Sequence, residues 1–258
     1  MKTPIALLAA TGTVGQKIIR LMDNHPQFEI TEVVASSANQ GKRYLEATQW
    51  RESETAPSVV NNLILKNPME LESKYVLSAL PGDVAVELEQ ALAEKGHIVI
   101  SNASAHRMRA DVPLLIPEIN PDHLSLTGEQ STSGKIITNP NCSTVFLCLG
   151  LAPLIKMAKI ENVHAVTLQA VSGAGYPGLS VMDIMGNIVP NIGGEEEKIE
   201  SEANKILGEP GKSAKFNVTT QVNRVPVLHG HTISLMVEFA EEVSESQVHE
   251  AFTLANKE

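Results

Sequence analysis

The amino-acid sequence predicts an α/β protein built of two domains, and three features of the chain support this prediction. The first hundred residues alternate short apolar runs with amphipathic segments, which is typical of βαβ units and a parallel sheet. The glycine-containing turn Ala9–Gly15 joins the first apolar run to a helix. After about residue 140 the predicted strands are longer and follow one another through loops, which favours a mixed or antiparallel sheet. We therefore expect a Rossmann-like, doubly wound parallel sheet over residues 1–139 and an α+β domain over residues 140–258.

The first domain is expected to contain five strands and two helices. Polar turns, proline and glycine separate its apolar runs, as where Pro81-Gly82 closes the third run. Apolar residues at helical spacing follow the first turn. We expect Asp83 to be the N-cap of a second helix, which runs to about Glu94. The predicted strands are Pro4–Ala10, Phe28–Ala35, Tyr75–Leu80, His97–Ser101 and Lys135–Thr138, and the first helix is Gln16–Asn24.

The second domain begins with a long apolar helix and continues with three long strands. Between the first two strands, Gly173–Gly211 is rich in glycine, proline and acidic residues and is expected to leave the sheet as an excursion. Within it, Glu195–Lys198 fits the solvated first turns of a helix that ends near Leu207. The last segment, Glu245–Glu258, has the pattern of an amphipathic helix without a stop signal, so we expect the chain to end early. The apolar helix is Ser143–Ala158, and the strands are Glu161–Ser172, Lys215–Val225 and Thr232–Ala240.

The composition excludes several classes of function. Thirty acidic residues against 20 basic ones give a formal net charge of −10. This balance argues against nucleic acid as a partner, because phosphate binding needs clustered Lys and Arg. No apolar stretch is long enough to span a membrane, and the apolar start is too short for a signal peptide, so we expect a cytoplasmic protein. The two cysteines, Cys142 and Cys148, lack the spacing and histidine neighbours of a zinc site, so we expect no metal.

The turn Ala9–Gly15 contains two glycines, Gly12 and Gly15, at the start of a helix. Such glycines let backbone N–H groups and a helix N-terminus approach a pyrophosphate, although a merely tight strand-to-helix turn also fits the pattern. The second predicted strand ends in Ser36–Ser37, with Lys42–Arg43 nearby, where an NAD site would normally carry a carboxylate. Hydroxyls and cations accept a 2′-phosphate that a carboxylate repels. This segment favours NADP, although it fits a solvated turn about equally well.

Cys142 is the candidate nucleophile. It directly follows a predicted strand, begins the apolar helix and has polar neighbours. A helix N-terminus stabilises a thiolate, so we expect a lowered thiol pKa. Cys148, which lies among leucines six residues later, fits a small buried hydrophobe. Arg224 and His231 lie between the last two predicted strands; histidine exchanges protons near neutral pH and arginine binds carboxylates, although loop histidines more often have no catalytic role.

Eight stretches of the chain together resemble the aspartate-β-semialdehyde dehydrogenase family, in particular its archaeal and fungal branch. They occur in the order in which the family has them and cover nearly the whole chain. No single stretch is decisive, but the joint match is highly specific. The stretches are Ala9–Gly15, Ser78–Ala85, Ser101–Met108, Ile116–Asn120, Thr138–Thr144, Leu168–Gly175, Gly193–Leu207 and Asn223–His231.

The resemblance implies an NADPH-dependent reductase of L-aspartyl 4-phosphate. The product would be L-aspartate 4-semialdehyde, the precursor of lysine, methionine and threonine, formed through a cysteine thioester. Carried over to this sequence, the resemblance makes Cys142 the acylated nucleophile and His231 the general acid/base. Gln169 would orient the thioester, and Asn141 would help to set its neighbouring carbonyl. The family forms dimers and tetramers, so a homodimer or homotetramer is expected.

The resemblance also assigns residues to the substrate and to the cofactor. Arg107 and Lys198 would hold the phosphate, Arg224 the α-carboxylate and Glu195 the α-amino group of the substrate. Three cations and one carboxylate suit an acidic substrate that carries an ammonium group. For the cofactor, the resemblance places Gly12, Thr13, Val14 and Gly15 at the pyrophosphate, and Ser172 and Gly173 at the nicotinamide. Ser36 and Ser37, inferred from the end of the second strand, are expected at the 2′-phosphate.

Two departures from the family affect these expectations. Ala9 replaces the usual first glycine, and a Cβ fits there only if the backbone avoids positive φ, so we expect a slightly displaced turn that still binds the cofactor. Family members also continue beyond residue 258, so a truncated chain would lack part of the cofactor pocket and of the core.

Four alternative functions share part of this pattern. An acyl-phosphate reductase of arginine biosynthesis and a malonyl-CoA reductase share the arrangement, but neither substrate presents a free ammonium to Glu195. A catalytically inactive nucleotide-binding partner is made plausible by the truncation, and a Cys–His hydrolase has no use for Ala9–Gly15.

Overall fold

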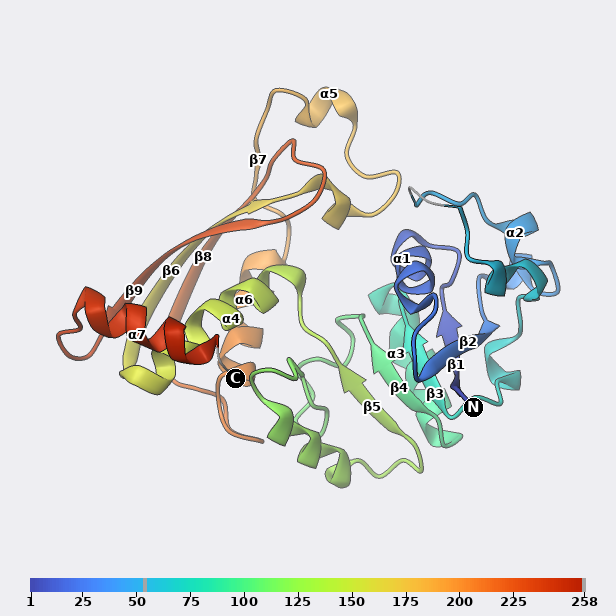
Figure 1. Ribbon diagram of the computed structural model, residues 1–258, viewed down its shortest axis with the longest axis horizontal. Helices are drawn as coiled ribbons and strands as arrows, with labels where there is room; N and C mark the ends of the chain where they lie inside the picture. Colours follow the sequence, from blue (N-terminus) through green and yellow to red (C-terminus); the bar gives the residue numbers. More distant parts are fainter. Residues whose placement is uncertain (53–54, 257–258) are drawn as a thin grey trace. The chain divides into compact units, whose positions relative to one another are not determined.

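A computed structural model describes residues 1–52 and 55–256 of the chain (Figure 1). The chain divides into two compact units, and each is described by itself. The N-terminal unit comprises Met1–Pro113 and Leu126–Asn139, and the C-terminal unit comprises Leu114–Ser125 and Pro140–Glu258. The segment Leu114–Ser125 thus differs from the sequence-based division, because Leu114 is buried in the hydrophobic core of the C-terminal unit.

The N-terminal unit contains a five-stranded sheet in the order β2-β1-β3-β4-β5, in which every neighbouring pair is parallel. This sheet confirms the predicted Rossmann-like architecture. The five strands were all predicted, and no predicted end differs from the observed one by more than two residues. They are β1 (Thr3–Leu8), β2 (Phe28–Val33), β3 (Tyr75–Ser78), β4 (Ile98–Ser101) and β5 (Lys135–Thr138).

Both faces of the parallel sheet are covered, which explains why its strands are continuous apolar runs. Side chains alternate along β1, so Leu7 packs in one hydrophobic cluster with Ile19, whereas Leu8 packs in another with Leu92. Ile19 belongs to α1 (Thr13–Met22) and Leu92 to α3 (Gly82–Glu94). The remaining helical segments of this unit are short: α2 (Tyr44–Ala47) and the 3₁₀ turns Ser37–Asn39, Ser58–Asn62 and Pro68–Glu70.

The expected role of Asp83 as a helix N-cap is wrong. Helix α3 already begins at Gly82, its N-cap is Pro81, and no side chain caps it. Asp83 instead lies in the first turn, where its carboxylate still faces the positive end of the helix dipole.

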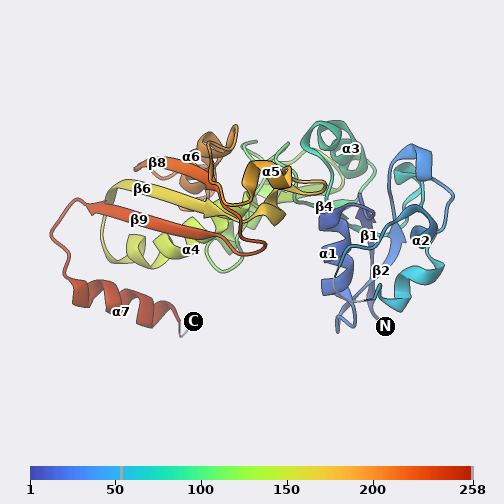
Figure 2. The same ribbon diagram turned by 90° about the horizontal axis from the view of Figure 1, so that it is seen from above.

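The C-terminal unit contains a mixed four-stranded sheet in the order β7-β8-β6-β9. Figure 2 shows β8, β6 and β9 side by side. Strands β6 and β8 are parallel, and the other two neighbouring pairs are antiparallel, so the prediction of a mixed sheet is confirmed. The strands are β6 (Ile160–Gln169), β7 (Val189–Pro190), β8 (Asn217–Arg224) and β9 (Thr232–Phe239). The helices are α4 (Cys142–Met157), α5 (Val181–Ile184), α6 (Glu195–Ile206) and α7 (Glu245–Ala255), with 3₁₀ segments Pro121–Glu129, which spans both units, and Val171–Ala174.

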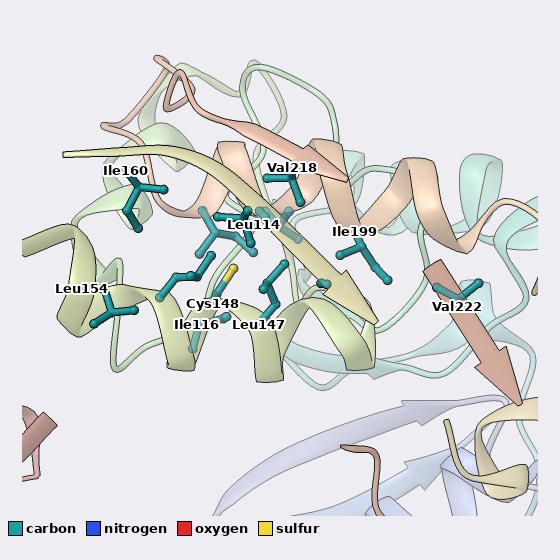
Figure 3. Packing of buried hydrophobic residues seen from close by; sticks show 14 residues of the cluster. Leu114, Ile116, Leu147, Cys148, Leu154, Ile160, Ile199, Val218 and Val222 are labelled. Atoms are coloured by element: carbon teal, nitrogen blue, oxygen red, sulfur yellow. The ribbon is translucent and has the colours of Figure 1, made fainter. Parts of the chain in front are cut away.

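Helices α4 and α6 pack on the sheet and form the core of this unit. Figure 3 shows Cys148 and Leu147 of α4 in one cluster with Ile199 of α6 and Val218 of β8. Cys148 is completely buried there, as the sequence predicted. Within residues 1–52 and 55–256, no helix is both long enough and apolar enough to cross a membrane.

Candidate active site

Cys142 belongs to the C-terminal unit and lies at the first position of α4. The helix is capped by Asn141, whose Oδ1 accepts the backbone N–H of Ser143 at 2.8 Å. Asn141 is buried, whereas Cys142 is exposed. The sulfur therefore stands at the open end of a well-anchored helix, in reach of a substrate.

His231 contacts Cys142 directly. It comes from the return between β8 and β9, and its Nε2 lies 3.1 Å from the sulfur of Cys142. Its other ring nitrogen, Nδ1, accepts the backbone N–H of Ala170 at 3.1 Å. Because an accepting nitrogen carries no proton, the neutral ring holds its proton on Nε2 and donates it toward the sulfur. The ring of Phe146, 5.8 Å away between centroids, packs beside the imidazole.

The electrostatics of this pair differ from the sequence-based expectation. Cys142 is exposed, yet loss of water around its sulfur raises the pKa of the thiol, and the negative charge of Glu195 raises it further. A backbone hydrogen bond from Ser143 and the charge of Arg224 oppose this rise without reversing it. The expected lowering of the Cys142 pKa is therefore wrong for the protein without substrate. Desolvation, followed by the charge of Arg224, lowers the pKa of His231, so the resting pair is a thiol and a neutral imidazole.

Gln169 and Arg224 occupy paired positions at the ends of β6 and β8. Both side chains are buried, and Nη1 of Arg224 donates to the carbonyl oxygen of Ala170 at 2.8 Å. The amide of Gln169 donates to Thr167 Oγ1 at 3.3 Å. Arg224 thus holds the same residue whose N–H orients His231.

Gly173 lies against both of these groups. A Cβ at this position would meet Nη1 of Arg224 at 2.9 Å and the ring of His231 at 3.6 Å. Any larger residue would therefore displace the guanidinium, whereas its contact with the imidazole would be an ordinary van der Waals contact. Ser172 is exposed beside it, in the 3₁₀ turn that follows β6.

The start of α6 brings an acid and a cation to the same cluster. Glu195 accepts the side-chain N–H of Asn141 at 2.7 Å, and Lys198 lies 3.5 Å from the other carboxylate oxygen of Glu195. The charge of Glu195 acts on both Cys142 and His231. The C-terminal unit therefore brings together all the catalytic and substrate residues predicted within it.

The remaining predicted substrate residue, Arg107, belongs to the N-terminal unit. It is buried, and its Nη2 donates to the carbonyl oxygen of Asn102 at 2.7 Å, in the loop that follows β4. This loop leaves the carboxyl end of a parallel strand, which is the edge where α/β sheets bind ligands.

The predicted pyrophosphate turn also lies at the carboxyl end of a strand, between β1 and α1. No side chain of the described residues caps α1, so the N–H groups of its first turn, at Thr13, Val14 and Gly15, are open to an anion such as a pyrophosphate. A Cβ at Gly15 would collide with the carbonyl oxygen of Ala9, which explains the glycine at this close approach of helix and turn.

Ala9 contradicts one expectation. Its φ is +54°, in the left-handed region that the sequence analysis expected it to avoid. The turn is therefore not displaced to suit a Cβ. Instead the alanine itself adopts a positive φ, at a cost of about 1–2 kcal/mol, and its carbonyl oxygen accepts the N–H of Gly12 at 3.0 Å.

The end of β2 is free of a competing carboxylate. Ser36 and Ser37 are exposed just beyond this strand. Glu32, the nearest acid of β2, accepts from Lys66 Nζ at 2.7 Å and from the backbone N–H of Ser73 at 2.8 Å. Burial raises the pKa of Glu32, but these hydrogen bonds lower it by more, so the carboxylate stays ionised. Its oxygens are bound by Lys66 and Ser73. The serines and the uncapped helix fit NADP.

Sequence reasoning missed three residues of the cluster. The backbone of Ala170 has no sequence signal, because any residue can supply its N–H. Phe146 could have been found, since it lies one helical turn after Cys142 and so shares its face of α4. Glu202 accepts the backbone N–H of Asn141 at 2.7 Å, and its spacing of seven residues, or two turns, from Glu195 places both acids on one face of α6.

Comparisons with known proteins identify the family of this chain. The semialdehyde dehydrogenase NAD-binding domain family matches residues 4–127, and the semialdehyde dehydrogenase dimerisation domain family matches residues 151–258. An aspartate-semialdehyde dehydrogenase of Archaeoglobus fulgidus is 42% identical, over 98% of this chain and 76% of its own length. The aspartate-semialdehyde dehydrogenase of Methanothermobacter thermautotrophicus is 45% identical, over 96% of this chain and 74% of its own length.

A solved structure is similar over the same range. The crystal structure of the aspartate semialdehyde dehydrogenase of Candida albicans with NADP has a TM-score of 0.87 and 36% identity, over 97% of this chain and 76% of that chain. Both domain families, the relatives and the fold point the same way. The chain belongs to the aspartate-semialdehyde dehydrogenase family.

Proposed function

We propose that the cluster around Cys142 carries out the reaction of this family, the NADPH-dependent reductive dephosphorylation of L-aspartyl 4-phosphate to L-aspartate 4-semialdehyde. The observation that carries the proposal is the 3.1 Å contact between the exposed thiol of Cys142 and Nε2 of His231. A thiol beside an imidazole is the arrangement of covalent catalysis by cysteine, which divides one difficult step into two easier ones.

In the first step Cys142 acts as the nucleophile. The thiol first gives its proton to solvent at the exposed sulfur. The thiolate then attacks the carbonyl carbon of the acyl phosphate; the C–S bond forms, the C–O bond to phosphate breaks, phosphate leaves, and a thioester remains on the enzyme. The Nε2–H of His231 supports the thiolate by donating to the sulfur. The pKa of Cys142 is raised in the protein without substrate, so a negative charge on its sulfur is unfavourable there. The hydrogen bond from His231 has to offset part of that cost.

In the second step the thioester is reduced. NADPH, when bound, supplies a hydride to the thioester carbon. The negative charge that develops on the carbonyl oxygen needs a hydrogen-bond donor, and the Nε2–H of His231 is placed to serve it as a general acid. When the C–S bond breaks, the proton on that oxygen returns to Nε2 of His231 and the semialdehyde leaves. Cys142 departs as a thiolate and takes a proton from solvent. Gln169 at the end of β6 orients the thioester in this scheme.

The charged residues of the cluster select the substrate. Arg224 binds the α-carboxylate, Glu195 the α-ammonium and Lys198 the phosphate, with Arg107 as a second phosphate ligand whose assignment rests on the family resemblance. Glu195 favours this substrate over an acetylated amine or malonyl-CoA, because only a free ammonium gains from a carboxylate. The Asn141 and Lys198 contacts leave carboxylate lone pairs of Glu195 for a further donor.

The family match includes a dimerisation domain over residues 151–258, so the protein is an oligomer. We infer a homodimer or a homotetramer of this chain. A cytoplasmic location also remains a prediction, based on the sequence.

NADPH is expected to bind at least about tenfold more tightly than NADH, because each charge-assisted contact to the 2′-phosphate contributes about 1.5–3 kcal/mol. Fluorescence titration of both cofactors measures the ratio. Ser36→Asp should weaken NADPH and spare NADH, since it restores the carboxylate that repels a 2′-phosphate. Equal affinities of the unchanged protein for the two cofactors would contradict the assignment of Ser36 and Ser37.

Arg107→Leu is expected to raise the KM for phosphate in the reverse reaction by about tenfold or more and to leave the KM for NADP unchanged, because the guanidinium contacts one ligand only. Lys95→Leu is the control. Lys95 is an exposed cation at the C-terminal end of α3, on the side of the sheet where the strands begin, whereas Arg107 follows the end of a strand. If both KM values of Arg107→Leu rise together, Arg107 serves the structure of its loop and not the phosphate.

A further inference from the structure

Helix α6 holds the residue before the nucleophile at two separate points. Glu195, at the start of the helix, accepts the side-chain N–H of Asn141, and Glu202, two turns later, accepts its backbone N–H; both distances are 2.7 Å. Asn141 in turn caps α4 through the N–H of Ser143 at 2.8 Å. The position of Cys142 therefore depends on a chain of hydrogen bonds that begins on another helix.

Glu202 is the deeper of the two anchors. Its side chain is 2% exposed, whereas that of Glu195 is partly open to solvent. A buried carboxylate is retained only where hydrogen bonds compensate for its lost water, and the N–H of Asn141 is such a donor. The carboxylate also faces the N-terminal end of α4, where the helix dipole favours negative charge.

The charge of Glu202 has a different target from that of Glu195. Glu195 raises the pKa of Cys142, whereas Glu202 contributes to the raised pKa of the buried Cys148. The contact of Glu202 with the segment of the nucleophile is the hydrogen bond that it accepts from the backbone N–H of Asn141.

We propose that Glu202 is a positioning residue, whose carboxylate fixes the backbone of Asn141 and so places the sulfur of Cys142 against His231 and the substrate. This proposal rests on the proposed function of Cys142. It makes α6 a shared support, because the helix that presents Glu195 and Lys198 to the substrate also sets the nucleophile.

Two substitutions separate position from charge. Glu202→Gln keeps an acceptor oxygen at the same reach and removes the charge, whereas Glu202→Asp keeps the charge and withdraws it by one methylene. We expect Glu202→Asp to lower kcat by about 10- to 100-fold, because a displacement of about 1 Å at a reacting group can cost 10²-fold. Glu202→Gln should stay within about threefold of the unchanged enzyme. The KM for NADP should not change in either variant.

Glu197→Gln is the matched control, since it removes the same charge from an exposed position of the same helix. Alkylation of Cys142 by iodoacetamide without substrate, followed by peptide mapping, gives a second readout that does not require turnover. Its rate should fall in Glu202→Asp and persist in Glu202→Gln. The melting temperature of each variant is recorded, so that a loss of folding is seen as such.

The reverse order, with Glu202→Asp active and Glu202→Gln impaired, would overturn the proposal in favour of a role for the charge. Unchanged kcat and alkylation in both variants would overturn it as well. If Glu202→Asp does not fold, alkylation and kcat of Glu202→Gln decide, because a loss in that variant contradicts the proposal. Failure of the proposed function has a separate signature: Cys142→Ser would keep its turnover while the Glu202 variants still changed the alkylation rate of Cys142.

Discussion

Replacement of Cys142 by serine is expected to lower kcat by at least about 10³-fold, since a hydroxyl supplies almost no anion near neutral pH and cannot form the thioester. NADPH binding should persist, because the cofactor turn lies in the N-terminal unit and does not include this residue. Steady-state kinetics and cofactor titration of the purified variant measure the two effects separately. Turnover within about tenfold of the unchanged enzyme would rule out the thioester.

Cys148→Ala is the matched control for this substitution. Cys148 is fully buried between α4 and the sheet, and burial raises the pKa of its thiol. Its replacement should leave kcat unchanged and lower the free energy of unfolding by about 1 kcal/mol. A denaturant titration monitors the second effect. The two cysteines of the chain thus give opposite outcomes, activity lost in one case and a little stability lost in the other.

Replacement of His231 by alanine is expected to lower kcat by about 10²- to 10⁴-fold, the usual contribution of a positioned proton donor. His231→Gln should recover part of this loss, because its amide N–H reaches about as far as Nε2 and donates in the same direction. His229→Ala is the control, since His229 is exposed on the same return between β8 and β9. Full activity of His231→Ala would contradict the assigned role.

The pH dependence of alkylation tests the electrostatics of the same pair. Because the pKa of Cys142 is raised, its alkylation rate should reach half of its maximum above the pH at which an ordinary cysteine does, at about 8.5. Because the pKa of His231 is lowered, the ring should stay neutral down to a pH below the ordinary value of about 6.5. If protonation of His231 produces an inflection at low pH in the alkylation rate of Cys142, that inflection should disappear in His231→Gln.

Much of the fold could be predicted from two local patterns, the continuous apolar runs of the first domain and the alternating strands of the second. Continuous apolar runs such as that of β1 occur where both faces of a strand are buried, and β1 does contact separate clusters through Leu7 and Leu8. The long strands after residue 140 alternate, because one face of their sheet packs against α4 and α6. Helix starts were less accurate: Asp83 has the chemistry of a cap, but Gly82 already has helical geometry.

The sequence predicted which residues form the candidate site, but not the burial, the neighbouring charges and the backbone conformation that act on them. The helix-dipole argument for Cys142 considers one favourable effect, whereas desolvation and Glu195 outweigh it in three dimensions. Ala9 was judged from its intrinsic preference, which tertiary contacts override. The tautomer of His231 depends on the N–H of Ala170, a backbone group that no side-chain pattern encodes.

The central claim, a thioester on Cys142, is tested most directly by trapping the acylated enzyme. The protein is mixed with L-aspartyl 4-phosphate in the absence of NADPH, quenched in acid and measured by intact mass and peptide mapping. The account predicts an added mass of one aspartyl group per chain, located on the peptide that contains Cys142, removed by hydroxylamine and absent from Cys142→Ser. An enzyme that turns over normally but carries no such adduct, or carries it on Cys148, would contradict the account.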